Sequence, residues 1–178
     1  MNSILKKLDR IAHSSWYWWF YILSGLASLA IALYFQYQRH ELPCIMCIQV
    51  RMWVALFIIV CGVGLLTRQT KIPNLLMQFF VVLIATGLVD RSYQLLGTER
   101  GFIISDCGFS LGLPAWLALD KWFPWLFGVE TSCGYTPVLA FGITMAEALM
   151  VLSLALLAGS LLVSLGSLLS MIINRGRK

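Results

Sequence analysis

Long apolar runs alternate with short polar segments along the chain, and four of the runs are long enough to cross a membrane. Spanning a bilayer core of about 30 Å as an α-helix takes roughly 20 apolar residues. We predict the spanning parts of the runs at 16–35, 44–66, 72–89 and 147–168. The predicted fold is therefore all-α, a four-transmembrane-helix bundle formed by residues 1–178 as a single membrane domain.

Charge and composition support this prediction. The first and third runs contain no Asp, Glu, Lys or Arg, and Arg51 is the one charged residue of the second. The chain is 60% hydrophobic and 12% charged, with a mean hydropathy of +0.83, whereas soluble domains carry about 25% charged residues. These values exclude a water-soluble or disordered chain. The net charge of +5 indicates no nucleic-acid partner, because the basic residues gather near the ends of the spans.

The distribution of Lys and Arg predicts the orientation. With the N-terminus inside, the inner segments hold Lys6, Lys7, Arg10, Arg68, Lys71, Arg175, Arg177 and Lys178. The longer outer segments hold Arg39, Arg91, Arg100 and Lys121. This asymmetry favours both termini in the cytoplasm. The first run is longer than the apolar part of a signal peptide and no small-x-small cleavage site follows it, so we interpret it as a retained span.

The segment 90–137 is the one long stretch outside the predicted spans, and a connection of that length is expected to be functional. Its part 113–127 is rich in aromatic residues, namely Trp116, Trp122, Phe123, Trp125 and Phe127. Such segments prefer the headgroup layer, which favours a short interfacial helix on the outer leaflet. An aromatic platform for a sugar or another ligand is the alternative.

Four of the five cysteines fall on the predicted outer side of the membrane: Cys44, Cys47, Cys107 and Cys133. Disulfides form and persist outside the cytoplasm, so these four predict either two disulfides or one network of exchanging thiols. Cys61 lies in the second span, roughly 21 Å below Cys47, and is interpreted as a small buried apolar residue.

Cys44 and Cys47 form a C-x-x-C motif directly after Pro43. Proline suits the first position of a helix, and the unpaired N–H groups of a helix N-terminus stabilise a thiolate. Arg51 follows one turn later on the same face, and a charge within a span is by default a functional hypothesis. It could stabilise a thiolate or donate to a carbonyl of a lipid-soluble ligand. Alternatively, it extends to the headgroups.

Cys107 and Cys133 are open to two interpretations, a static staple of the outer loop or disulfide exchange with the C-x-x-C motif. Zinc sites made of cysteines need two closely spaced pairs, and this second pair is widely split, so no metal site is predicted. Haem attachment is excluded because Ile48, and not a histidine, follows Cys47.

These residues resemble the disulfide bond formation protein B (DsbB) family of bacterial inner membranes, which helps to keep the periplasm oxidising. The first matching motif is Pro43-Cys44-x-x-Cys47-x-x-x-Arg51. The second consists of Cys107 and Cys133 flanking Pro114-x-Trp116-Leu117-x-Leu119-Asp120-Lys121-Trp122-x-Pro124. The resemblance covers residues 16–168 and implies a multi-pass inner-membrane protein whose redox cysteines face the periplasm.

The resemblance further implies a thiol:quinone oxidoreductase. In such an enzyme, a disulfide between Cys107 and Cys133 oxidises a DsbA-like periplasmic partner, whose thiolate attacks Cys107. Cys133 then exchanges with Cys44, and Cys47 faces the ring of a membrane quinone, either ubiquinone or menaquinone. Arg51 matches the quinone-site arginine of the family, and Met145 falls where the family also lines that site.

Two other functions are weighed against this one. A membrane protein stapled by two static disulfides would need no quinone and would tolerate Cys47→Ser. A carrier that passes cytosolic electrons outward would need a redox pair reachable from both sides, and no second cysteine accompanies Cys61 in the inner half.

Overall fold

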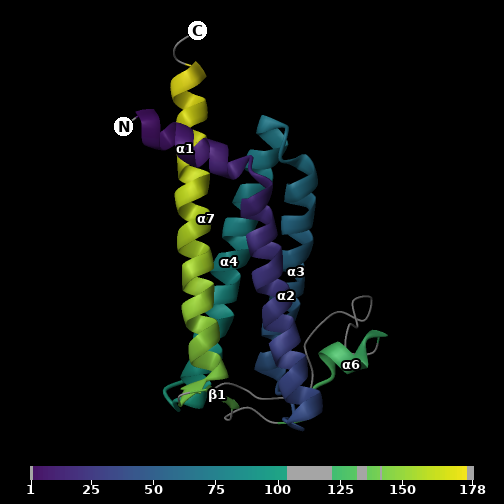
Figure 1. The fold of residues 1–178 in the computed structure, drawn as a ribbon. Helices are drawn as coiled ribbons and strands as arrows, with labels where there is room; N and C mark the ends of the chain where they lie inside the picture. Colours follow the sequence, from purple (N-terminus) through teal and green to yellow (C-terminus); the bar gives the residue numbers. More distant parts are fainter. Residues whose placement is uncertain (1, 104–121, 132–135, 141, 176–178) are drawn as a thin grey trace.

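The computed structural model describes residues 2–103, 122–131, 136–140 and 142–175, and most of them are helical (Figure 1). In chain order the elements are α1 (Asn2–Ala12), α2 (Ser15–Gln38), α3 (Ile45–Thr67), α4 (Lys71–Glu99), α6 (Pro124–Phe127), β1 (Val138–Ala140), β2 (Ile143–Thr144) and α7 (Met145–Arg175). The two short strands pair antiparallel as a hairpin directly before α7.

Within the described residues, α2, α3, α4 and α7 are long and apolar enough to cross a membrane. Figure 1 shows the four helices side by side as a bundle, with α7 against α4 and α2 against α3. All four exceed the roughly 20 residues that a span needs. The predicted all-α fold with four membrane-spanning helices is confirmed.

Two helices, α4 and α7, extend well beyond the spans predicted from hydropathy. Helix α4 continues to Glu99, so residues 90–99, expected in the outer loop, belong to the helix. Polar residues such as Asp90 and Gln94 end the apolar run but do not break a helix, which stops before Gly101 at its positive φ of 76°. Likewise, α7 is a single unbroken helix from Met145 to Arg175.

Helix α1 was not predicted, because its eleven residues are too few for a span and include several charges. It lies across one end of the bundle against α7 (Figure 1), where Ser167 donates to Asp9 at 3.2 Å. The carbonyl of Ala12 accepts from Trp18 Nε1 and from Asn74 Nδ2. The first bond joins the end of α1 to α2, and the second joins it to α4.

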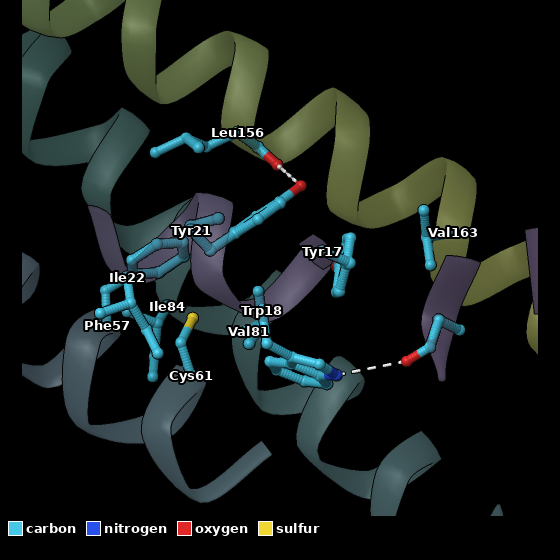
Figure 2. Packing of buried hydrophobic residues seen from close by; sticks show 12 residues of the cluster. Tyr17, Trp18, Tyr21, Ile22, Phe57, Cys61, Val81, Ile84, Leu156 and Val163 are labelled. Atoms are coloured by element: carbon cyan, nitrogen blue, oxygen red, sulfur yellow. Dashed lines mark hydrogen bonds between the residues drawn. The ribbon is translucent and has the colours of Figure 1, made fainter. Parts of the chain in front are cut away.

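A cluster of buried apolar residues occupies the part of the bundle nearer α1. Figure 2 shows Tyr17, Trp18 and Tyr21 of α2 beside Phe57 and Cys61 of α3. Trp18 and Cys61 have no exposed surface, and the Tyr21 hydroxyl donates to the carbonyl of Leu156 at 3.2 Å. This cluster holds α2, α3 and α7 together.

The helix ends and the segments that connect them lie at two opposite ends of the bundle (Figure 1). The start of α1, the end of α7 and the turn between α3 and α4 lie at one end (Figure 1). The start of α3, helix α6 and the hairpin lie at the other. Because the number of spans is even, the start of α1 and the end of α7 lie at the same end. The opposite end contains the candidate site.

Candidate active site

The C-x-x-C motif forms the start of α3. Cys44 is the N-cap residue, and its sulfur accepts a hydrogen bond from the backbone N–H of Cys47 at 3.4 Å. The Sγ atoms of Cys44 and Cys47 are 3.0 Å apart. A disulfide bond of about 2.05 Å would therefore need the two sulfurs to approach by only about 1 Å. The geometry suits a pair that alternates between dithiol and disulfide.

Pro43 lies just outside the helix rather than at its first position. The helix begins at Ile45, after the N-cap, because the Cys44 sulfur takes the capping role that a serine or aspartate oxygen often fills. The sulfurs nevertheless lie at the helix N-terminus, where backbone N–H groups and the helix dipole stabilise negative charge.

Arg51 is buried one turn further along α3, with 6% of its surface exposed. Its Nη1 donates to Gln36 Oε1 at 2.5 Å and to the carbonyl of Leu126 at 3.1 Å, while Nη2 donates to the carbonyl of Ala32 at 3.2 Å. The guanidinium is thus held inside the protein instead of extending to the headgroups. Its Nε is also buried and has no hydrogen-bond partner among the described residues.

A cavity lies between α2, α3, α4 and α7 beside this arginine. Its volume of about 50 Å³ exceeds the roughly 10–15 Å³ that one water molecule needs. The lining is mostly apolar and includes seven residues with polar or sulfur atoms in their side chains, namely Ser28, Gln36, Glu41, Cys47, Arg51, Thr136 and Met145. Of the two described cysteines of the motif, Cys47 lines the cavity and Cys44 does not.

The described part of the outer loop lies against both Arg51 and the C-x-x-C motif. In α6, Leu126 bonds Arg51, and the neighbouring Trp125 carbonyl accepts from the Tyr37 hydroxyl at 2.7 Å. Further along, Thr131 pairs with Cys44 as an isolated β-bridge. The loop therefore reaches the two groups on which the predicted chemistry depends.

A family model described as disulfide bond formation protein DsbB matches residues 14–163, most of the chain. The chain belongs to the DsbB family. It is 30% identical over 165 residues to disulfide bond formation protein B 2 of Pseudomonas aeruginosa, covering 92% of this chain and 93% of the relative. It is 32% identical to disulfide bond formation protein B of Shewanella sp. strain MR-4, over 78% of this chain and 79% of that protein.

Its membership in the DsbB family identifies the chain as a disulfide bond formation protein of the membrane, and therefore as a disulfide-forming oxidoreductase. Two of its predicted redox residues, Cys107 and Cys133, lie outside the described residues, as does most of the aromatic segment 113–127. The described part, 122–127, includes the four-residue helix α6. Trp122, Phe123 and Trp125 are exposed there, while Phe127 is buried.

Residues that sequence reasoning missed complete the site of this DsbB-family protein. Gln36 is buried at 8% exposure and bonds Arg51 from the neighbouring helix. Its one visible signal in the sequence is a polar amide directly after the uncharged first span, 16–35. The Ala32 and Leu126 carbonyls could not be foreseen, because any residue type supplies a backbone acceptor.

Proposed function

We propose that this protein reoxidises a DsbA-like periplasmic thiol oxidase and passes the electrons to a membrane quinone. The partner's two thiols become a disulfide and give up two electrons and two protons. The quinone, ubiquinone or menaquinone, takes up both and becomes a quinol. Family membership supports a disulfide-forming enzyme, and we infer the partner and the electron acceptor.

The observation on which the proposal chiefly rests is the pair of sulfurs 3.0 Å apart beside a cavity with a buried arginine. A mostly apolar pocket with a few directed polar groups is typical of small-molecule sites. Static disulfides would require neither the cavity nor a buried guanidinium with an unsatisfied Nε.

The residues of the cavity fit a quinone. Arg51 would donate a hydrogen bond to one carbonyl oxygen of the ring, because its buried Nε lacks an acceptor in the described structure. Met145, at the start of α7, would supply an apolar and polarizable contact. When bound, a quinone supplies a lipid-soluble acceptor for two electrons.

The two cysteines of the motif have surroundings that suit different tasks. Cys44 is beside Thr131 of the outer loop, and Thr131 precedes Cys133 by two residues in the sequence. We assign to Cys44 the exchange with Cys133, after the partner has attacked Cys107. Cys47 lines the cavity, and to it we assign the contact with the quinone.

The proposed location is the bacterial inner membrane, with both termini in the cytoplasm and the redox cysteines on the periplasmic side. The arrangement of the helix ends supports this orientation. Arg68 follows the end of α3 and Lys71 begins α4, both at the same end as α1, whereas Cys44 and Cys47 lie at the start of α3, at the opposite end (Figure 1).

The test is quinone reduction by the purified protein in detergent, driven by a reduced DsbA-like donor. We expect wild-type protein to reduce ubiquinone or menaquinone and Cys47→Ser to lose this activity. The matched control is Cys61→Ala, which removes a buried cysteine of the same helix outside the site and should retain turnover.

Two results would contradict the proposal. Folded wild-type protein that reduces neither quinone would favour a membrane protein stapled by static disulfides. Equal turnover by Cys47→Ser and wild type would exclude the C-x-x-C motif from the electron path.

A further inference from the structure

We propose that Glu99, at the end of α4, is a positioning residue that holds one wall of the cavity in the shape that binds quinone. The inference rests on the proposed function and adds a residue to its site. Glu99 Oε2 accepts from the hydroxyl of Thr136 at 2.5 Å and from that of Thr144 at 3.2 Å. One carboxylate oxygen thus joins two segments of the chain to α4.

Those two segments are the two ends of the β1–β2 hairpin. Thr136 precedes β1, and Thr144 is the last residue of β2, directly before α7. Without a partner from another element, a hairpin with strands of three and two residues is marginal. The carboxylate closes its open end and fixes it to the helix.

The base of this hairpin is also a wall of the cavity. Thr136, Pro137 and Met145 all line it, and the N–H of Met145 donates to the carbonyl of Pro137 at 2.9 Å. Leu95, one turn before Glu99 on α4, lines the cavity as well. Glu99 is therefore directly behind the wall and holds Thr136, which is itself 4% exposed.

A carboxylate suits this position because hydrogen bonds to a charged acceptor are stronger than neutral ones. The neighbouring cation, Arg100, pairs with Glu147 instead. Glu147 in turn forms a capping box with Thr144, in which each backbone N–H donates to the other residue's side chain. Glu99, the last residue of α4, and Arg100, its C-cap, thus hold the hairpin and the first turn of α7.

The experiment compares Glu99→Leu with Glu99→Gln in purified protein. Equilibrium dialysis measures binding of a short-chain ubiquinone without any thiol donor, and hydrogen exchange measures the protection of the Met145 amide. In Glu99→Leu we expect roughly tenfold weaker binding, since small misplacements of a binding wall are costly, together with faster exchange. In Glu99→Gln both changes should be clearly smaller, because the neutral amide oxygen still accepts both hydroxyls, though through weaker hydrogen bonds.

Asp90→Leu is the matched control, because it removes an exposed carboxylate from the same helix. Should Glu99→Leu fail to fold, Thr136→Val removes one of the two donors and leaves the capping box of Thr144 and Glu147 intact, and it is expected to give the same two changes at smaller size. A folded Glu99→Leu variant, or Thr136→Val in its place, that binds ubiquinone and protects Met145 like wild type overturns the proposal.

The same experiment separates this inference from the proposed function. Wild-type protein that binds neither the ubiquinone nor a short-chain menaquinone used in its place overturns the proposed function, and with it the role of Glu99 in quinone binding. Wild-type binding that Glu99→Leu leaves unchanged overturns only the inference about Glu99.

Discussion

The two ends of helix α3 place cysteines in opposite environments. Cys44 and Cys47 lie at its N-terminus, beside backbone N–H groups, each other's sulfur and a buried arginine. Cys61 is fully buried among the rings of Tyr21 and Phe57 and aliphatic side chains (Figure 2). The same side chain is positioned for exchange at one end and for packing at the other.

The two ends of the bundle also differ in how their buried polar side chains are hydrogen-bonded. At the cysteine end, Arg51 is buried with three acceptors and one unsatisfied donor. In the aromatic cluster, the polar atoms of Trp18 and Tyr21 each bond a single backbone carbonyl, and the rest is close packing. Among the described residues, both ends contain a buried polar atom without a hydrogen-bond partner, Arg51 Nε at one and the Tyr17 hydroxyl at the other, but only the arginine lies beside the cavity of the candidate site.

The largest effect is expected from Arg51→Lys. A lysine cannot reproduce the planar fork of donors that reaches Gln36, Ala32 and Leu126. Loss of hydrogen bonds to a buried charged group costs roughly 2–3 kcal/mol, so kcat/KM for quinone reduction should fall about 100-fold. The measurement is a titration with short-chain ubiquinone at a fixed concentration of the reduced donor.

Arg91→Lys is the control for that variant. Arg91 lies on α4, bonds Gln49 and Gln94, and is not among the residues that line the cavity in the described structure. We expect its kcat/KM within a factor of two or so of wild type, as for most surface substitutions. Equal values of kcat/KM for the two lysine variants would contradict the special role of Arg51 among the outer arginines.

The packed end can be disturbed by a single methyl group. A Cβ at Gly64 would lie 2.2 Å from the ring of Trp18, which is fully buried and cannot move away freely. Overpacking of this kind costs typically 1–3 kcal/mol, so Gly64→Ala should lower the melting temperature in detergent. Quinone reduction below that temperature should stay close to wild type, because the change is remote from the cavity.

Gly62→Ala separates this clash from a general effect of glycine in a helix. A Cβ at Gly62 has nothing within 4 Å. Because alanine favours helix over glycine by about 1 kcal/mol, this variant should be as stable as wild type or slightly more stable. Equal destabilisation by both substitutions would show that the cost of Gly64→Ala does not come from a clash with Trp18.

The two ends of the bundle also show which features could be predicted from the sequence. Hydropathy predicts the four spanning helices because the requirement is local: enough apolar residues in a row. The C-x-x-C motif and the arginine one turn later are likewise local, so their shared helix face could be predicted. Cys107 and Cys133 lie outside the described residues, and their roles stay predictions.

What could not be predicted depends on contacts between distant parts of the chain. Gln36, Leu126 and Glu99 gain their importance from partners on other elements, such as Arg51 and Thr136. Hydropathy also misplaced the end of α4, since it detects where lipid ends and not where a helix does. Helix α1 was missed for a related reason, because it lies across the bundle end and spans nothing.

The smallest effect is expected from the hydrogen bond that joins α2 to α7 in the aromatic cluster. Tyr21→Phe removes the hydroxyl that donates to the Leu156 carbonyl at 3.2 Å and leaves the ring in place (Figure 2). A neutral hydrogen bond contributes about 1 kcal/mol net, and Leu156 still bonds within its own helix, so the loss should be of that size or less. Thermal unfolding in detergent measures it, with Tyr34→Phe as the control on an exposed tyrosine of the same helix. A loss well above 2 kcal/mol would mean that the packed end, too, depends on polar groups, and the distinction between the two ends of the bundle would then be one of degree.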